Sequence, residues 1–304
     1  MSVPVLLLVG LALGQTDAGY VRTRTPDGQH CFHWPVAAGA RSTITFVQSD
    51  AGYAPLGPRF FGAVSRAAST WQTQFQTCGS VNLVEGALSS SRLVGYDDHA
   101  ANENLVLVRI RDCGAVVAAS DPCWASASCG NAYDCWEHGL DVLALTTVTA
   151  GSSDGVVVDA DTEINAVTKF PTLVDSPPCP PGAPATNCVA NDLQGFETHE
   201  FGHFLGLAHA PDPNSTMYFL VPYGDTSRRT LDPGSQQFVC DVYPTGQASN
   251  DCSLGGASAN ASSGCSASGA PGGLAASLLA LLSLGLRRAG ARRARGTGSP
   301  PEVT

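Results

Sequence analysis

The sequence predicts an α+β domain in which strands and amphipathic helices follow one another along the chain. Alternating or continuous apolar runs predict strands at 43–48, 105–110 and 140–149, with a further β-rich stretch at 156–158. Apolar residues spaced by three and four predict a helix that begins near Pro58. Two more helices are expected, one beginning near residue 191 or 192 and a short one over 232–243.

The first helix carries a clear apolar stripe. Pro58 suits its first turn, because the N–H that proline lacks has no partner there in any helix. The stripe consists of Phe60, Val64, Ala67, Trp71 and Phe75. We interpret it as ordinary core packing, since a stripe of this kind buries one face of a helix against the rest of a domain.

Cysteine usage indicates an oxidising compartment. The chain has eleven cysteines and no C-x-x-C pair, which favours disulfides over a thiolate metal site. The first ten could form five bridges, and the sequence leaves their pairing open. Cys179 and Cys188 could close the proline-rich loop 176–188, and four cysteines suggest that 112–140 is a disulfide-stapled insertion. Cys265 is the odd one.

Composition divides the chain into four segments. Val3–Leu13 is apolar and too short to span a bilayer, which is typical of a signal peptide, assigned to 1–19. The folded domain is expected over 20–245. A Gly/Ser/Ala-rich linker follows over 246–273, and the tail 274–304 combines the short apolar stretch Leu274–Leu286 with an arginine cluster.

Charge excludes one class of partner. The formal net charge is −10, and five of the sixteen basic residues lie in the C-terminal arginine cluster. The chain before that cluster has only eleven basic residues against 25 acidic ones. We therefore predict no nucleic-acid partner, because phosphate binding needs a cationic surface.

The stretch that carries chemistry is T-H-E-F-G-H-F-L-G-L-A-H at residues 198–209. On a helix His199 and His203 share one face about 6 Å apart along the axis, so both imidazoles can reach one Zn²⁺ ion. Glu200 is rotated about 100° from His199 and flanks the metal. A base for an activated water molecule belongs at that position.

A third histidine requires the helix to end. On a continuous helix His209 would point about 240° away from His203 and lie about 9 Å further along the axis. Gly206 allows the chain to turn, because glycine adopts positive φ without steric cost. Three histidines would leave the fourth zinc position open, as a catalytic site requires.

The remaining histidines, Cys31 and several aspartates could also bind metals, but their positions in the sequence do not connect them with this motif. His30, His33, His99 and His138 are predicted to be surface or packing histidines, and Cys31 a disulfide partner. Asp97, Asp98, Asp159 and Asp161 are predicted to be solvated or turn carboxylates, with structural Ca²⁺ as the alternative left open.

These residues resemble the metzincin metalloproteases, and the matrixin group in particular. The motif H-E-x-x-H-x-x-G-x-x-H is matched in full by His199, Glu200, His203, Gly206 and His209. The stretch H-A-P-D-P-N-S-T-M-Y at 209–218 resembles the turn that places a methionine, here Met217, beneath the metal. One departure is Phe219, which stands where the group usually has proline after Met-Tyr.

The resemblance covers roughly residues 40–245 and implies a zincin/metzincin-like fold. Such a fold is a twisted five-stranded mixed sheet with three main helices and an active-site cleft. It implies a zinc endopeptidase in which His199, His203 and His209 hold Zn²⁺ and Glu200 is the general base. The protein or peptide substrate is expected to lie extended along the edge strand and to contact Leu143, Ala144, Leu145, Thr146 and Thr147. A monomer is expected.

The tail has a resemblance of its own. Gly264-Cys265-Ser266, an apolar stretch and an arginine cluster are similar to the C-terminal sorting signal of myxobacterial surface proteins. This similarity implies a transient or processed membrane anchor, with Cys265 as the processing position. The protein is then expected to be secreted or held at the surface of a bacterial envelope.

Three alternatives to a protease remain at this stage. One is an inactive, surface-displayed protein of the same fold that acts in binding or adhesion, which the intact Glu200 argues against, because such a site needs no base. Another is a zinc hydrolase for non-peptide bonds, whose cleft would lack a free edge strand. A purely structural zinc site is the third.

Overall fold

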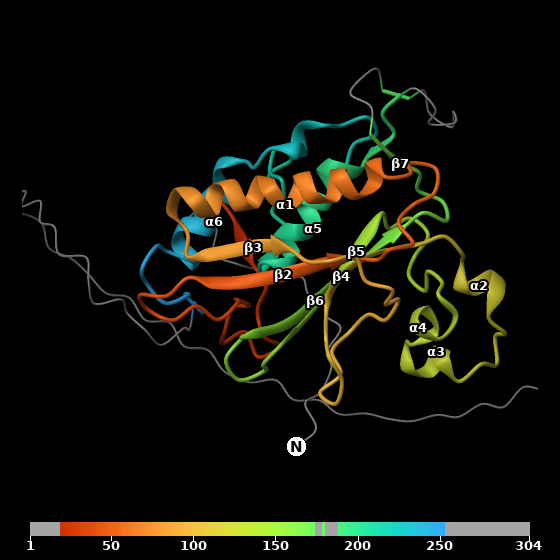
Figure 1. Ribbon diagram of the computed structural model, residues 1–304, viewed down its shortest axis with the longest axis horizontal. Coiled ribbons are helices and arrows are strands. Elements are labelled where there is room, and N and C mark those ends of the chain that lie inside the picture. The colour runs from red at the N-terminus through yellow and green to blue at the C-terminus, as the bar shows by residue number, and fades with distance from the viewer. Residues whose placement is uncertain (1–18, 174–177, 180–187, 253–304) are drawn as a thin grey trace, which may run out of the picture. The chain divides into compact units, whose positions relative to one another are not determined.

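The computed structural model describes residues 19–173, 178–179 and 188–252, which form a sheet with three long helices on one face (Figure 1). The strands lie in the order β3-β2-β4-β6-β5. They are β2 (Ser42–Gln48), β3 (Val81–Glu85), β4 (Asn104–Arg109), β5 (Ala144–Ala150) and β6 (Val157–Asn165). Only β5 runs antiparallel to its neighbour, so the predicted α+β fold with a five-stranded mixed sheet is confirmed, and β5 is an edge strand.

The three long helices begin and end close to the predicted positions. They are α1 (Arg59–Cys78), α5 (Leu193–Phe204) and α6 (Pro233–Val242). Asp192 caps α5 by accepting a hydrogen bond from the Gly195 N–H, and Asp232 caps α6 in the same way. These caps satisfy N–H groups that have no partner inside the helix, which is why both helices begin at an aspartate.

The core lies between the helices and the sheet. The apolar stripe of α1 is buried there, as predicted, and Trp71 is completely enclosed. Its indole N–H donates to the Thr198 carbonyl at 2.8 Å, which joins α1 directly to α5. Across the layer, Phe201 of α5 meets Phe46 of β2 edge to face at 5.0 Å between ring centroids. Each such buried side chain contributes about 1.5–3 kcal/mol, so α5 is held firmly on both sides.

Short elements complete the fold around α5. β1 (Val21–Arg22) pairs with β9 (Leu207–Ala208), and β7 (Pro171–Thr172) pairs with β8 (Asn191–Asp192). A 3-10 helix, η1 (Ser227–Arg229), precedes α6. The two small pairs fix the chain just before α5 begins and just after it ends.

The predicted disulfide-stapled insertion is confirmed and lies beside the sheet, at the lower right of Figure 1. It contains three short helices: α2 (Cys113–Val116), α3 (Cys123–Ser126) and α4 (Cys129–Tyr133). The bridges Cys113–Cys135 and Cys123–Cys129 close it. The buried Arg109 of β4 connects it to the sheet, because its guanidinium contacts Asp134 of the insertion at 2.8 Å and Glu163 of β6 at 2.7 Å.

The other three disulfides also involve only the first ten cysteines, which confirms five bridges. They are Cys31–Cys252, Cys78–Cys240 and Cys179–Cys188. Cys31 is thus a disulfide partner, as predicted. Its bridge ties Cys252 to the folded domain, and the neighbouring Asp251 pairs with His30 at 3.0 Å.

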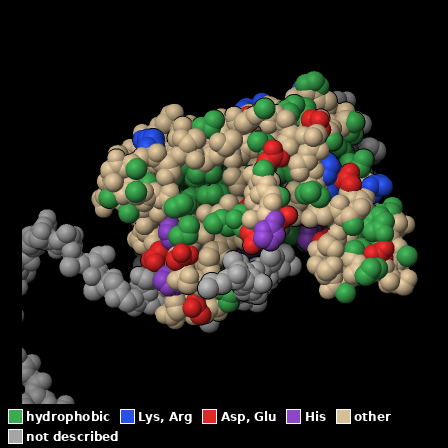
Figure 2. Space-filling view, turned by 60° about the horizontal axis from the view of Figure 1, so that its bottom comes forward, with side chains coloured by type: hydrophobic (Ala, Val, Ile, Leu, Met, Phe, Trp, Pro, Cys, Tyr) green, Lys and Arg blue, Asp and Glu red, His purple; other side chains and the backbone are tan. Residues whose placement is uncertain are grey.

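Several predictions concern other parts of the chain. The signal peptide, the linker beyond 252, Cys265 and the arginine-rich tail lie outside the described residues. Among the residues that are described, no helix is both long and apolar enough to cross a membrane. Five disulfides indicate an extracellular, oxidising environment. Acidic side chains are spread over the face that Figure 2 shows, where basic ones are few.

The prediction that Asp159 and Asp161 are solvated or turn carboxylates is wrong. Both lie in β6 and are 1% exposed, on the sheet face opposite α5. Asp161 accepts hydrogen bonds from the N–H groups of Gly95 (2.6 Å) and Leu105 (2.8 Å). It therefore holds the segment between β3 and β4, which contains Gly95, against the sheet. The physical reason is that β6 is a central strand, covered on both faces. Asp97 and Asp98 are exposed, as predicted.

Burial makes this aspartate pair a source of pH dependence. Desolvation raises the pKa of Asp161 to about 8, helped by the charge of Asp159, whose own pKa is raised by burial to about 6. The folded protein therefore keeps protons that the unfolded chain has released. The free energy of unfolding should fall as the pH rises through the folded pKa values, because the unfolded state binds fewer protons there.

We expect Asp159→Asn to weaken this pH dependence. The substitution removes a negative charge beside Asp161, so the loss of stability between pH 7 and 9 should be smaller by about 1 kcal/mol than in the wild type. Urea unfolding at several pH values measures the difference, and parallel curves for the two proteins would contradict the expectation.

Candidate metal and active site

The sequence brings His199, His203 and His209 together by ending a helix sharply. α5 carries the first two histidines one turn apart and stops at Phe204. Gly206 then has a φ of +105°, and a Cβ there would lie 2.4 Å from the Phe32 carbonyl oxygen. Only glycine satisfies both conditions, so the chain turns back and presents His209 to the helix, as predicted.

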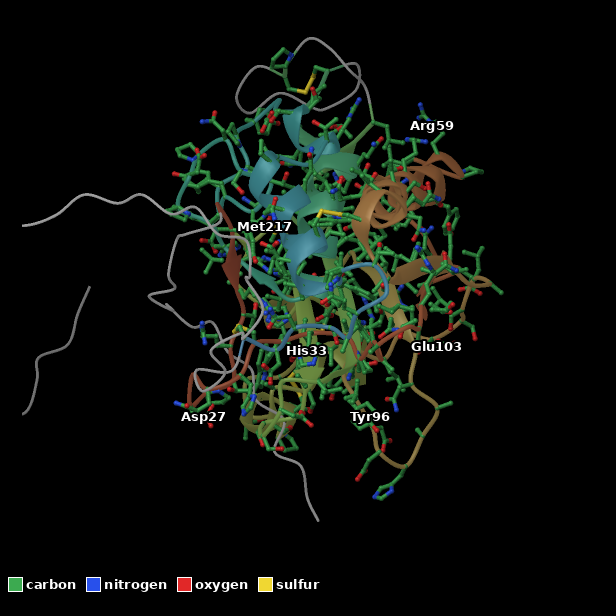
Figure 3. All side chains as sticks on the ribbon, turned by 90° about the vertical axis from the view of Figure 1, so that its left-hand side faces the viewer. Asp27, His33, Arg59, Tyr96, Glu103 and Met217 are labelled. Carbon is green, nitrogen blue, oxygen red and sulfur yellow. A yellow bond between two sulfur atoms is a disulfide. The ribbon has the colours of Figure 1, made fainter. Side chains whose placement is uncertain are left out.

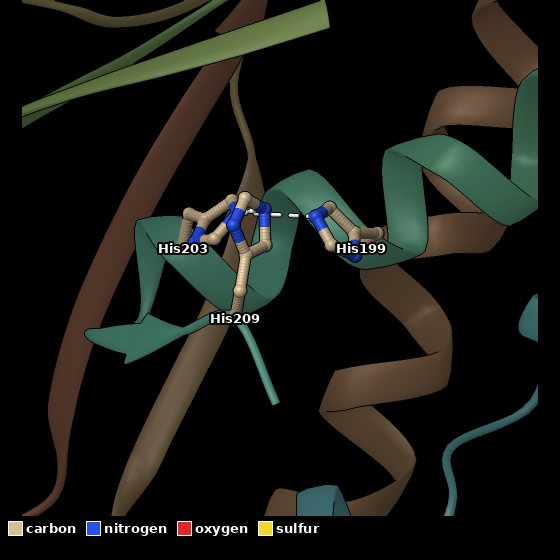
Figure 4. A group of neighbouring side chains, drawn as sticks. All are labelled: His199, His203 and His209. Atoms are coloured by element: carbon tan, nitrogen blue, oxygen red, sulfur yellow. Dashed lines mark hydrogen bonds between the residues drawn. The ribbon is translucent and has the colours of Figure 1, made fainter. Parts of the chain in front are cut away.

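The three imidazoles converge through their Nε2 atoms (Figure 4). The Nε2 of His203 lies 3.1 Å from that of His199 and 3.2 Å from that of His209. On the other side of the rings, the Nδ1 of His199 is 2.7 Å from the Thr216 carbonyl oxygen, and the Nδ1 of His203 is 2.8 Å from that of Leu207. A carbonyl only accepts hydrogen bonds, so both Nδ1 atoms carry the proton.

This protonation pattern points to a cation between the rings. With Nδ1 protonated, the Nε2 atoms of His199 and His203 present lone pairs to each other and cannot hydrogen bond. A zinc ion at about 2.0–2.1 Å from each nitrogen, in tetrahedral geometry, would space the nitrogens about 3.3 Å apart. The donor set therefore fits Zn²⁺, and the carbonyls act as outer partners that fix ring orientation.

The electrostatic environment keeps these histidines neutral. Burial lowers the pKa of all three, that of His199 well below its usual value and that of His209 to about 4. The neighbouring ring of His203 lowers the pKa values of His199 and His209 further. Neutral imidazole is the form that binds a metal, so the site is prepared for one at neutral pH.

Glu200 lies on the side of α5 that faces the edge strand. Its side chain is 6% exposed, and the hydroxyl of Thr146 in β5 donates a 2.7 Å hydrogen bond to its Oε2. Burial raises the pKa of Glu200 to about 7, while the hydrogen bond from Thr146 lowers it. A carboxyl group that titrates near neutrality can both accept and return a proton.

Met217 lies inside the fold, next to the helices (Figure 3), and is 1% exposed. It packs against α5 so closely that a Cβ on Gly202 would come within 2.2 Å of its sulfur. The turn that holds it is closed by the Ala210 N–H, which donates to the Met217 carbonyl at 2.8 Å. The same turn supplies the Thr216 carbonyl for His199, so it supports the site from below.

The predicted substrate strand is a free edge. The Asn165 N–H donates to the Leu143 carbonyl. Main-chain groups in an antiparallel pair point alternately toward and away from the partner strand, so this bond fixes which residues of β5 face β6. Leu145 and Thr147 therefore turn their main-chain groups toward β6. The outward groups belong to Ala144, Thr146 and Val148, and no described residue pairs with them. The five residues predicted to bind substrate thus alternate between the sheet and the open edge.

Arg228 is a structural residue of this site that the sequence analysis missed. It is 4% exposed, and its guanidinium donates to the carbonyls of Tyr218 and Leu220, just after the methionine turn. This holds the backbone while the Phe219 side chain stays exposed, with its ring centroid 6.4 Å from that of His209. Phe219 therefore borders the histidines. An Arg-Arg pair in a polar stretch carries no sequence signal for this role.

A second missed residue is Glu197, one turn before Phe201 on α5. It is fully buried, and neither of its carboxylate oxygens has a hydrogen-bond partner among the described residues. Burial, and then the charge of Glu200, raise its pKa well above the usual value. Burial therefore favours the protonated, neutral form of this side chain.

The remaining predicted histidines stay apart from the site. His33 is buried, with its Nδ1 2.9 Å from the Cys31 carbonyl oxygen, and His138 contacts Glu163 at 3.3 Å. His30 pairs with Asp251, and His99 is exposed beside Asp98. None of the four joins a group of metal-binding side chains in the described part of the chain.

A separate cavity of about 700 Å³ contains no predicted site residue. Its lining includes Trp34, Ile44, Tyr96, Asn104 and Val157. The group of residues that could carry out a reaction is therefore the histidine cluster together with Glu200 and the open edge of β5.

Comparison with known proteins agrees with this arrangement. The matrixin family model matches residues 126–243, which include α5, the three histidines and Met217. Matrilysin from Felis catus is 41% identical over 46 residues, which is 15% of this chain. The matched stretch spans only 18% of the length of that matrilysin. Together these similarities support a matrixin-like zinc metalloprotease.

Proposed function

We propose that this chain is an exported zinc endopeptidase. The observation that carries the proposal is the convergence of three neutral imidazole Nε2 atoms next to Glu200 and to the edge strand β5, whose outer side pairs with no described residue. His199, His203 and His209 would hold the ion. A bound zinc ion would polarise the scissile carbonyl group of the substrate and lower the pKa of a water molecule.

The residues of the chain do the remaining work. The substrate lies extended and pairs with the outward main-chain groups of Ala144, Thr146 and Val148, as an added strand. Glu200 accepts a proton from the attacking water at Oε1, the oxygen that Thr146 does not engage, and passes it to the leaving amine. Met217 and the Thr216 carbonyl keep His199 in place from below.

Export and surface retention belong to the same proposal. Support comes from the five disulfides and from the sequence patterns of the signal peptide and of the tail around Cys265. Structural Ca²⁺ stays an alternative. A monomer and a transient or processed anchor are proposed as well.

Removal of the metal tests the function. We expect the full-length protein, secreted with its disulfides intact, to cleave casein, and a zinc chelator to reduce cleavage to background. Added Zn²⁺ should restore it, because the ligands are preformed. Residue 252 must be included, since Cys31 would otherwise be unpaired.

The alternatives make different predictions in the same experiment. One zinc per chain with no cleavage of any unfolded protein would favour an inactive binding or adhesion protein. Cleavage that persists when zinc is removed would contradict the metal mechanism. The free edge of β5 argues against a zinc hydrolase for non-peptide bonds, whose substrates have no strand to add.

A further inference from the structure

The side chain of Thr146 connects the edge strand with the carboxylate beside the histidines. Thr146 is near the middle of β5 and pairs with Thr162 of β6 in the sheet register. Its hydroxyl lies 2.7 Å from Glu200 Oε2 and 3.0 Å from the Thr162 hydroxyl. The three side chains form a continuous hydrogen-bonded chain from a central strand through the edge strand to the helix.

Counting protons shows which group donates and which accepts in each of these hydrogen bonds. Each threonine hydroxyl has one proton to donate. The Glu200 carboxylate is the stronger acceptor, so the Thr146 proton points to Oε2 rather than to the Glu200 carbonyl oxygen, which is 3.4 Å away. The Thr162 hydroxyl then donates to the Thr146 oxygen.

The contact fixes the orientation of Glu200. Within the described residues, no other side chain hydrogen bonds to its carboxylate. Thr146 and Thr162 are β-branched, and each belongs to a strand, so their hydroxyls have little rotational freedom. A freely rotating glutamate would lose this alignment, whereas a carboxylate held at Oε2 keeps Oε1 in one place.

We propose that Thr146 is a positioning residue for Glu200 and couples it to substrate binding. The proposal rests on the function proposed above. The main-chain groups of Thr146 face the open edge, where a substrate strand would pair, while its side chain holds the base. One residue therefore aligns the substrate backbone and the proton acceptor with respect to each other.

Three substitutions test the role in the full-length, zinc-loaded protein. Thr146→Val removes the hydroxyl and keeps the shape, Thr146→Ser keeps the hydroxyl, and Thr162→Val removes the second link. We expect Thr146→Val to lower kcat by about 10- to 100-fold, because a base displaced by about 1 Å loses that much. KM and the zinc content should stay within about twofold of wild type, since the main chain and the histidines are unchanged.

The other variants separate positioning from a general structural effect. Thr146→Ser should recover most of kcat, and Thr162→Val should cause a smaller loss than Thr146→Val. Thr43→Val, an exposed threonine on β2, is the matched control and should behave as wild type. A kcat of Thr146→Val within twofold of wild type would overturn the proposal, and so would equal losses in the valine and serine variants.

A second measurement does not depend on activity. Crystal structures of the zinc-free wild type, Thr146→Val and Thr43→Val proteins should show Glu200 displaced only in Thr146→Val. A Glu200 side chain that stays in place without the hydroxyl would overturn the positioning role, even in an active enzyme. If Glu200 moves but the wild type binds zinc and cleaves nothing, the proposed endopeptidase function fails while the positioning role stands.

Discussion

Glu200→Ala is expected to reduce kcat by about 10²–10⁴-fold or more while zinc stays bound. General-base catalysis contributes a factor of this size, and no other described ionisable side chain is placed to replace it. The nearby Glu197 is buried in the core, where its pKa is raised well above the usual value by burial. Casein cleavage and metal analysis on the same preparation measure both quantities.

Two further variants sharpen that experiment. Glu200→Gln keeps the size of the side chain and an oxygen that can accept from Thr146, yet it cannot take a proton. It should be as inactive as Glu200→Ala. Glu103→Ala changes an exposed glutamate and serves as the control. Retained proteolysis in either Glu200 variant would remove this residue from the mechanism.

Arg109→Met is expected to lower the free energy of unfolding by about 3–5 kcal/mol. The Arg109 side chain is fully buried and neutralises Glu163, which is 5% exposed, at 2.7 Å. Removing Arg109 leaves the buried Glu163 charge with only the His138 ring beside it, at 3.3 Å, and such a loss is costly. The pair also connects the sheet to Asp134 of the disulfide-stapled insertion, so both parts should lose stability together in urea unfolding.

The matched control is Arg111→Met, on an exposed arginine two residues away. It should change stability by less than about 1 kcal/mol, because exposed ion pairs and hydrogen bonds contribute little. The double variant Arg109→Met/Glu163→Leu should recover part of the loss, since no charge is then left alone in the core. A wild-type midpoint for Arg109→Met would show that the pair does not hold the domain together.

Local patterns predicted much of the fold correctly, and they located the three histidines that the fold brings together. The period of the apolar residues located α1, and the aspartates at 192 and 232 located the first turns of α5 and α6. These features depend on residues three or four apart, so they can be read without knowledge of the rest of the chain. The prediction of four carboxylates as solvated failed for Asp159 and Asp161, because strand order decides which strand is central.

The sequence by itself determined the three histidines, the glycine that ends the helix and the acid between them, because all lie within one short stretch whose spacing follows from helix geometry. Only the tertiary structure decided what surrounds them. Thr146 lies 54 residues before Glu200 in the sequence. Arg228 lies 29 residues after His199. Their contacts arise from the pairing of β5 with β6 and from the turn after Met217, and no local pattern records pairings over such separations.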